Sequence, residues 1–160
     1  MKNIQKLLVI LGPTSSGKTR LAVAVAKKFD GEIVSADSRQ VYCGMDIGTG
    51  KDIKEYGLIP HHLLDVVNPR TRFSAARYQQ LAYKATQDIL RRGKLPILAG
   101  GTGLYIQSIV DGTSFPNAKP DPELRRKLAA LSLPALLKRL KNLDPATFAR
   151  IDKRNRRRVE

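Results

Sequence analysis

Short apolar runs alternate with stretches of helical periodicity through the first 112 residues of the chain. The runs predict buried strands, and they are LLVILG (7–12), EIVSAD (32–37), HHLLDVV (61–67) and LPILAGG (95–101). Apolar residues recur at helical spacing over 17–29 and 74–92, and TGLYIQSIV (102–110) is expected to open a further helix. Short apolar strands separated by helices are typical of a parallel sheet with helices on both faces. The pattern therefore predicts an α/β core for residues 1–112.

The character of the sequence changes after Gly112. A Pro-rich connector, TSFPNAKPDP, leads into helical stretches around DPELRRKLAAL, LPALLKRLKNL and DPATFARI. Asp121 and Asp144 each precede a proline, which suits a helix start with Asp as the cap and Pro in the first helical position. Residues 113–160 are therefore predicted to form a basic helical segment appended to the core.

Basic residues strongly outnumber acidic ones, with 29 Lys and Arg against 14 Asp and Glu and a formal net charge of +15. The excess is densest in residues 119–160, which hold 13 basic and 5 acidic residues. Such a surplus favours an anionic partner, and nucleic acid is the leading candidate. The alternative is a solvated basic surface without a partner.

Composition also argues against several classes of protein. No apolar run reaches the roughly 18 residues of a membrane-spanning helix, and the N-terminal stretch lacks a signal-peptide cleavage site. A cytoplasmic protein with no membrane partner is therefore expected. The single cysteine, Cys43, cannot form an internal disulfide, and no metal-binding spacing of Cys or His occurs.

The segment GPTSSGKT lies between the first apolar run and the first helical stretch. This context suits the phosphate-binding pattern G-x-x-x-x-G-K-[ST], in which loop amides and a helix N-terminus point at phosphate oxygens. Lys18 contributes a positive charge, and the Thr19 hydroxyl can bind Mg²⁺. The predicted phosphate-binding residues are Gly12, Pro13, Thr14, Ser15, Ser16, Gly17, Lys18 and Thr19. A purely structural Gly-rich turn is the alternative, and the loop alone specifies only a polyphosphate.

Asp37 closes the second apolar run. In an open parallel sheet, residues at the carboxyl ends of strands face the ligand crevice, so Asp37 is expected to point toward the bound phosphate. A carboxylate beside a diphosphate can act as a general base. The alternatives for Asp37 are a cap or a group that orients the Mg²⁺ ligands.

Further motifs follow GPTSSGKT in the order DSRQVYCGMDIGTGK (37–51), HHLLD (61–65), FSAARY (73–78) and GGTGLY (100–105). Together they resemble the motif set of the tRNA dimethylallyltransferases, and the resemblance runs across all 160 residues. The related adenylate isopentenyltransferases share the loop and a similar HHLL element, but DSRQ and GGTGLY are more similar to the tRNA-acting branch. The resemblance implies a P-loop NTPase-like parallel sheet flanked by helices.

The resemblance also implies a reaction. Dimethylallyl diphosphate would be the bound polyphosphate, and its five-carbon group would pass to the exocyclic amine of an adenosine beside the tRNA anticodon. The macromolecular partner is then the anticodon stem-loop, and the cofactor is Mg²⁺ on Thr19. Lys18, Thr19 and the loop amides would stabilise the departing diphosphate. Asp37 would take a proton from the attacking amine.

The residues that the resemblance places against tRNA are Asp37, Ser38, Arg39, Gln40, Thr102, Arg125, Arg157 and Arg158. The Gln40 amide can pair with the edge of an extruded adenine through one donor and one acceptor. The arginines of the tail would contact phosphates, which supply affinity and register. For Thr102 the alternative is a tight strand-to-helix turn, and for each tail arginine it is a solvated helix face. His61 and His62 are expected to pack or to hydrogen-bond.

Family members continue beyond the position of Glu160, so elements that close the sheet and a further diphosphate-contacting arginine are expected outside these residues. Two other functions fit the sequence. A P-loop kinase of small molecules would turn over ATP, and a basic RNA-binding module would bind without catalysis. A monomer is expected.

Overall fold

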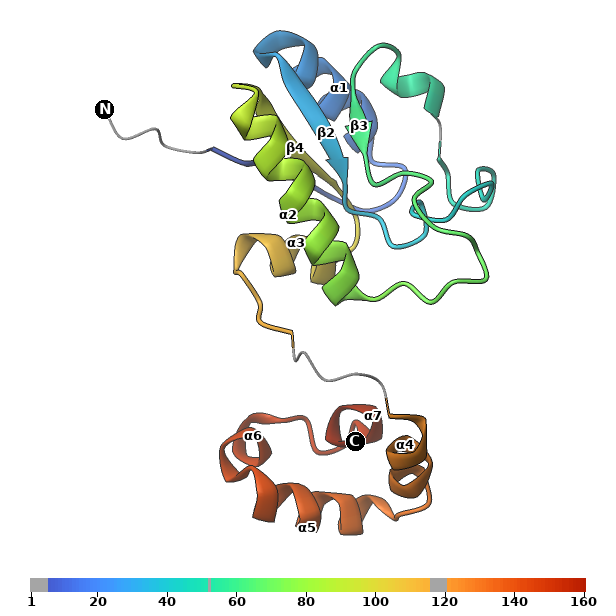
Figure 1. Ribbon diagram of the computed structural model, residues 1–160, viewed down its shortest axis with the longest axis vertical. Coiled ribbons are helices and arrows are strands. Elements are labelled where there is room, and N and C mark those ends of the chain that lie inside the picture. The colour runs from blue at the N-terminus through green and yellow to red at the C-terminus, as the bar shows by residue number, and fades with distance from the viewer. Residues whose placement is uncertain (1–5, 52, 116–120) are drawn as a thin grey trace, which may run out of the picture. The chain divides into compact units, whose positions relative to one another are not determined.

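The computed structural model describes residues 6–51, 53–115 and 121–160. The chain divides into two compact units, residues 1–115 and 116–160. The first unit is a sheet covered by helices, and the described part of the second unit contains helices and no strand (Figure 1). The α/β fold predicted for the N-terminal part of the chain is confirmed.

The sheet of the first unit is parallel. Within the described residues its strands are β1 (Leu8–Leu11), β2 (Gly31–Ser35), β3 (His61–His62) and β4 (Leu95–Gly100). They lie in the order β1-β4-β2-β3, so β4 separates β1 from β2. Leu11 pairs with Gly100, and Ser35 pairs with Ala99. The carboxyl ends of the three longer strands therefore meet at one edge of the sheet.

The third strand is shorter than the sequence predicts. The run 61–67 was expected to be extended, but only His61 and His62 pair with β2. Leu63 and Asp65 have φ angles of 65° and 51°, which turn the chain out of the extended conformation. Val67 pairs separately in an isolated bridge. The strand prediction over this run is therefore wrong beyond His62.

The helices of the first unit begin and end close to their predicted bounds. Those in the described part of this unit are α1 (Lys18–Phe29), α2 (Ala75–Arg91), α3 (Gly103–Val110) and the short 3₁₀ helix η1 (Ile53–Tyr56). Ser74 Oγ accepts the backbone N–H of Arg77 at 3.2 Å and caps α2. Gly93, with a φ angle of 76°, follows the end of this helix.

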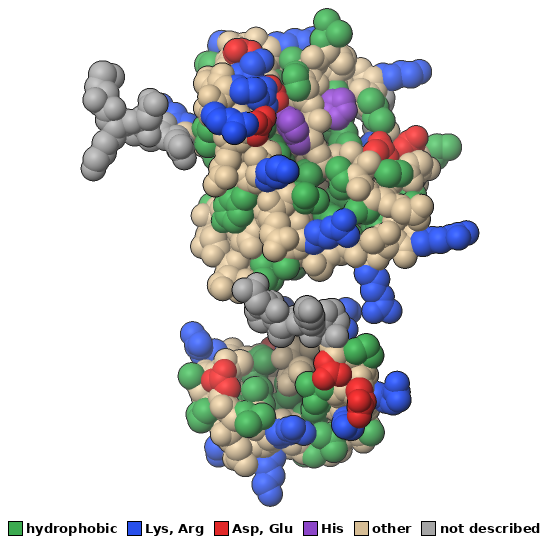
Figure 2. Space-filling model, in the orientation of Figure 1, with side chains coloured by type: hydrophobic (Ala, Val, Ile, Leu, Met, Phe, Trp, Pro, Cys, Tyr) green, Lys and Arg blue, Asp and Glu red, His purple; other side chains and the backbone are tan. Residues whose placement is uncertain are grey.

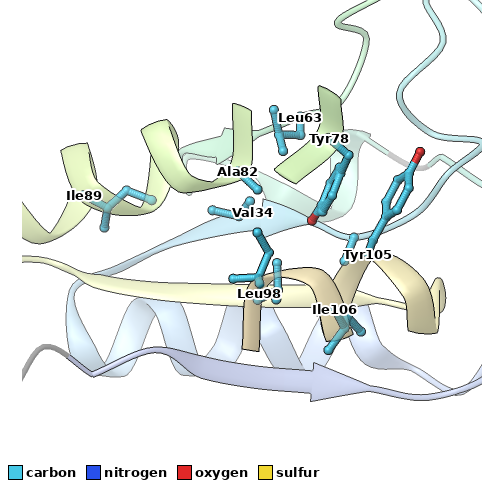
Figure 3. Close-up of a cluster of buried hydrophobic side chains, with 10 residues drawn as sticks. Val34, Leu63, Tyr78, Ala82, Ile89, Leu98, Tyr105 and Ile106 are labelled. Carbon is cyan, nitrogen blue, oxygen red and sulfur yellow. The ribbon is translucent and has the colours of Figure 1, made fainter. Parts of the chain in front are cut away.

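Both faces of the sheet are covered by helices. Val34 and Leu98 point from one face toward Ala82 and Ile89 of α2 and Ile106 of α3 (Figure 3). The opposite face packs on α1, and the cluster there comprises Ile10, Ala22, Val23, Ala26, Ile33, Tyr56 and Ile97. Because both faces of the sheet are buried, the strand sequences are short continuous apolar runs.

The second unit is a small helical assembly. Its described helices are α4 (Pro122–Ala129), α5 (Leu133–Leu143), α6 (Pro145–Arg150) and α7 (Arg156–Val159). The side chains of Asp121 and Asp144 accept first-turn backbone N–H bonds of 2.9 and 2.8 Å, as the Asp-Pro pairs predict. Leu136 and Val159 are buried inside the unit. Lys and Arg side chains project from its surface (Figure 2).

A buried carboxylate lies near the amino end of β2. Glu32 is 2% exposed, and both of its oxygens contact the Arg92 guanidinium, with Nη2 2.8 Å from Oε2. His62 Nε2 lies 2.8 Å from the same Oε2, so this histidine hydrogen-bonds as expected. The hydrogen bonds from Arg92 lower the pKa of Glu32 to about 2 against the opposing effect of burial, and His62 adds to this effect.

This lowered pKa predicts how stability depends on pH. The ionised Glu32 stabilises the fold fully above its ordinary pKa of 4.5, and this contribution is lost as the pH falls toward 2. Chemical denaturation should show that Glu32→Gln lowers the free energy of unfolding by on the order of 3 kcal/mol at pH 7. The difference from wild type should shrink as the pH falls below 4.5. The control Glu55→Gln, at a more exposed pair with Arg20, should cost far less.

Candidate active site

The phosphate loop, residues 12–19, follows β1 and includes the first two residues of α1. Ser15 and Gly17 have positive φ angles of 63° and 80°, and Gly17 is the N-cap of α1. The first turn of this helix contains no Asp or Glu, so no carboxylate there neutralises the positive end of the helix dipole. Lys18 Nζ donates to the Pro13 carbonyl, which folds the lysine back over the loop. Loop, helix end and lysine are thus arranged as an anion site.

A cavity of about 80 Å³ opens beside the phosphate loop, at the carboxyl ends of β2 and β4. Its polar lining comprises Thr14, Ser15, Lys18, Thr19, Asp37, Gln40, Thr49 and Tyr56. A second hollow, of about 370 Å³, is lined by residues 14–20 together with Gly50 and Glu55. The structure therefore brings Asp37 and Gln40 into one cavity with Lys18 and Thr19.

Hydrogen bonds from two sides hold the segment around Asp37. The Ala36 N–H donates to a carbonyl of β4 at 2.8 Å, and the Thr102 N–H donates to Ala36 O at 3.0 Å. Thr102 Oγ1 in turn accepts the Ser38 N–H at 2.9 Å. The half-buried Asp37 carboxylate accepts the Arg39 N–H at 2.9 Å. Thr102 thus forms the strand-to-helix turn and also fixes the residue that follows Asp37.

The glycine that opens the GGTGLY motif is explained by this close approach of chains. A Cβ on Gly100 would lie 2.2 Å from Ala36 O, which is far inside any real contact. Gly101 lies near the phosphate loop, because its Cβ would meet Gly12 O at 3.2 Å. The motif therefore lets β4 pass between the phosphate loop and the segment that carries Asp37.

Gln40 is held by internal hydrogen bonds rather than facing solvent freely. Its Nε2 donates to Thr49 O and to Gly50 O, each at 3.4 Å. Its Oε1 accepts the Ser35 hydroxyl at 3.4 Å. The adenine pairing predicted for Gln40 would require these long bonds to be exchanged for bonds to the base. Arg39, the preceding residue, is exposed.

Two residues near the cavity were not predicted from the sequence. Tyr56 is buried and lines the cavity; burial raises its pKa, and a hydrogen bond to the Thr19 side chain opposes that rise. Lys51 is also buried; hydrogen bonds to Asp65 and Asp46 outweigh the opposing effect of burial and raise its pKa. Lys51 ends the motif DSRQVYCGMDIGTGK, but its residue type gave it no role, and Tyr56 lies in a stretch with neither strand nor helix periodicity.

The three tail arginines predicted to touch tRNA lie in the second unit. Arg125 is on α4, and Arg157 and Arg158 are on α7; all three are exposed. Their neighbour Arg156, which the prediction passed over, has a structural role instead. Its Nη2 donates to the carbonyl of Ala129, the last residue of α4, at 2.9 Å and to the carbonyl of Leu131, just after the helix, at 2.8 Å.

Two further kinds of site are absent from the part of the chain that the structure describes. No group of three or more His, Cys, Asp and Glu side chains there could hold a metal ion. No helix there is long and apolar enough to cross a membrane. The Thr19 hydroxyl, beside the cavity with Asp37, is a hard oxygen donor of the kind that Mg²⁺ takes together with phosphate oxygens.

A parallel sheet with this loop between its first strand and first helix defines a P-loop NTPase-like α/β protein. Similar solved structures support this fold. The tRNA isopentenylpyrophosphate transferase of Bacillus halodurans is 42% identical with a TM-score of 0.69, and the match covers 97% of this chain and 53% of that one. A eukaryotic dimethylallyltransferase, solved acting on tRNA, is 31% identical with a TM-score of 0.84 over 97% of this chain and 40% of that one.

Sequence comparison assigns the family. The model of the IPP transferases matches residues 40–160. The tRNA dimethylallyltransferase 1 of Geotalea daltonii is 52% identical over 139 residues, which are 87% of this chain and 45% of that protein. The tRNA dimethylallyltransferase 2 of Syntrophotalea carbinolica is 49% identical over 96% of this chain and 51% of that protein. The chain belongs to the IPP transferase family and spans about half the length of these relatives.

Proposed function

We propose that the protein transfers a dimethylallyl group from dimethylallyl diphosphate to the exocyclic amine of an adenosine beside the tRNA anticodon. Its relatives are named tRNA dimethylallyltransferases, and one solved neighbour acts on tRNA. The observation that carries the proposal is the shared cavity, in which Asp37 lies with the phosphate-loop residues Lys18 and Thr19. A reaction that needs an anion site and a base side by side is supported by this arrangement.

The phosphate loop acts on the leaving group. As the bond between the allylic carbon and the diphosphate oxygen breaks, negative charge grows on the diphosphate. Loop amides and the amino end of α1 are fixed before the reaction, so they stabilise this charge without reorganisation. Lys18 exchanges its bond to Pro13 O for a phosphate oxygen. Thr19 would hold a Mg²⁺ ion, which supplies further neutralisation of the diphosphate.

Asp37 acts on the acceptor. The adenine amine is a weak nucleophile because its lone pair is delocalised into the ring. The nitrogen forms a bond to the allylic carbon, and one of its protons passes to the Asp37 carboxylate. The Thr102 N–H donates to Ala36 O, and the Thr102 hydroxyl oxygen accepts the Ser38 N–H, so the backbone on both sides of Asp37 is held in place. The adenine is an extruded base, since its amine is unreachable within a stack.

The remaining predicted residues serve tRNA binding. Ser38, Arg39 and Gln40 follow Asp37 directly, so they would contact the nucleotides around the extruded adenosine. Arg125, Arg157 and Arg158 are exposed in the basic second unit, where contacts to phosphates add affinity rather than sequence choice. The net charge of +15 favours such an anionic partner.

The proposal is tested by incubating the protein with labelled dimethylallyl diphosphate, Mg²⁺ and unmodified tRNA. Label should enter the tRNA, and nuclease digestion should recover it on the exocyclic nitrogen of a single adenosine beside the anticodon. Transfer to free AMP but not to tRNA would instead show an adenylate isopentenyltransferase. ATP turnover without transfer of label would show a kinase, and either result would contradict the proposal.

A further inference from the structure

A lysine with a fully buried side chain lies at the end of the segment that follows Asp37 and Gln40. The exposed fraction of the Lys51 side chain is 0%, although its ammonium is charged. Its Nζ lies 2.9 Å from Asp46 Oδ1, contacts Asp65 Oδ1, and donates to Tyr42 O at 3.0 Å. A buried cation with two carboxylates and a carbonyl has its hydrogen-bonding needs met, and such a group holds its neighbours firmly.

Several stretches of chain meet at this ammonium. Asp65 accepts the Gly44 N–H on the same Oδ1 at 3.3 Å, and its own N–H donates to Gln40 O at 3.2 Å. The Lys51 N–H closes a turn on Asp46 O at 3.1 Å. The lysine therefore ties together residues 40–44, residues 45–51 and the left-handed residue Asp65 that follows β3.

Residues 45–51, here called the wall segment, have little apolar anchorage. Ile47 is 99% exposed and Met45 is 43% exposed, whereas the buried side chains of the segment are Thr49 and Lys51. The segment forms turns without a strand or helix. Its position therefore depends on polar contacts rather than on hydrophobic packing, and the buried ammonium of Lys51 makes three of them.

The wall segment forms part of the cavity. Thr49 and Gly50 line it together with Asp37, and Gly50 also lines the second hollow beside the phosphate loop. The Gln40 amide donates to the carbonyls of both wall residues. A displacement of the wall segment would therefore change the shape of the cavity and release Gln40.

We infer that Lys51 is a positioning residue, whose buried ammonium fixes the wall segment so that Thr49 and Gly50 shape the cavity for the organic part of its ligand. The inference rests on the proposed function for the identity of that ligand, dimethylallyl diphosphate. Lys51 touches no reacting atom and acts through Asp46, Asp65 and the wall segment.

The test compares Lys51→Met with a matched control, Lys94→Met. Lys94 also pairs with two carboxylates, Asp30 at 3.2 Å and Glu32 at 3.7 Å, but it adjoins the amino end of β4, away from the strand ends that form the cavity. Circular dichroism first identifies a temperature at which wild type and both variants are folded. Isothermal titration in the presence of Mg²⁺ then measures the affinities for dimethylallyl diphosphate and for inorganic pyrophosphate.

Lys51→Met should weaken dimethylallyl diphosphate binding by about tenfold, because a misplaced site wall costs affinity even when the anion donors are intact. Pyrophosphate binding should change much less, since the loop amides are untouched. Lys94→Met should change neither affinity. A purely structural role for Lys51 would lower stability and leave this ratio of affinities at its wild-type value.

A folded Lys51→Met variant with wild-type affinity for dimethylallyl diphosphate would overturn the inference and leave the proposed function standing. Failure of the wild-type chain to bind either ligand would overturn both. Should Lys51→Met not fold, Asp46→Asn removes one ion pair at a carboxylate that is 56% exposed. This variant should weaken the binding of dimethylallyl diphosphate more than the binding of pyrophosphate. An unchanged ratio of the two affinities would again overturn the inference.

Discussion

Replacing Asp37 with asparagine is expected to slow dimethylallyl transfer to tRNA by about 10²- to 10⁴-fold, the range for loss of a general base. Asparagine has nearly the shape of aspartate and can still accept the Arg39 N–H through its amide oxygen. It cannot take the proton of the adenine amine. The affinity for dimethylallyl diphosphate should stay close to wild type, because the anion donors belong to the phosphate loop. Single-turnover transfer of label to unmodified tRNA measures the rate, and titration measures the affinity.

The control for this substitution is Asp111→Asn. Asp111 is an exposed carboxylate at the end of α3 and does not line the cavity. Its replacement should leave the transfer rate unchanged. If Asp37→Asn transferred label at the wild-type rate, the carboxylate would not be the base, and its place in the cavity would have to be explained by tRNA or Mg²⁺ binding.

Replacing Lys18 with methionine is expected to weaken dimethylallyl diphosphate binding by about 100-fold. Charge-assisted hydrogen bonds of an ammonium to phosphate are among the stronger contacts in a binding site, and each tenfold in affinity corresponds to about 1.4 kcal/mol. The stability of the fold should change little, because Lys18 Nζ bonds only to the Pro13 carbonyl among the contacts described and the methionine keeps the apolar stem. Titration of the folded variant measures the loss.

Lys27→Met serves as the matched control for Lys18. Lys27 lies on the same helix in its last turn and is exposed, so the variant loses one positive charge without altering the loop. Affinity near wild type for Lys27→Met and a large loss for Lys18→Met would show a local contact. Equal small losses in both would show that only the overall charge of the protein matters.

The architecture of the first unit could be predicted because strand and helix limits are marked locally. β1 and β4 are apolar runs that end at glycines, and α2 begins at a serine cap and ends before Gly93. HHLLDVV has the composition of a strand, yet it leaves the extended conformation at Leu63. The backbone after Leu63 takes part instead in contacts distant in sequence, such as Lys51 with Asp65, which a local pattern does not contain.

The candidate site also has a part that the sequence predicts and a part that it does not. The phosphate loop is encoded within eight consecutive residues, and strand order brings Asp37 to the same edge of the sheet. The buried Lys51, the internal bonds of Gln40 and the helix-capping Arg156 depend on how irregular segments fold back on one another. Residue type alone therefore predicted a ligand-facing position for Gln40, where the structure has internal partners, and gave no role to Lys51 or Arg156.

The central claim is that a diphosphate occupies the phosphate loop with Asp37 beside it. The most direct test is a pyrophosphate titration of the ¹⁵N-labelled chain followed by amide chemical shifts, with Mg²⁺ present. If the claim holds, the largest shift changes fall on residues 12–19, with smaller changes at Asp37 and Ser38 and none of comparable size in the second unit. Shift changes confined to the basic second unit, or spread evenly over its lysines and arginines, would contradict it.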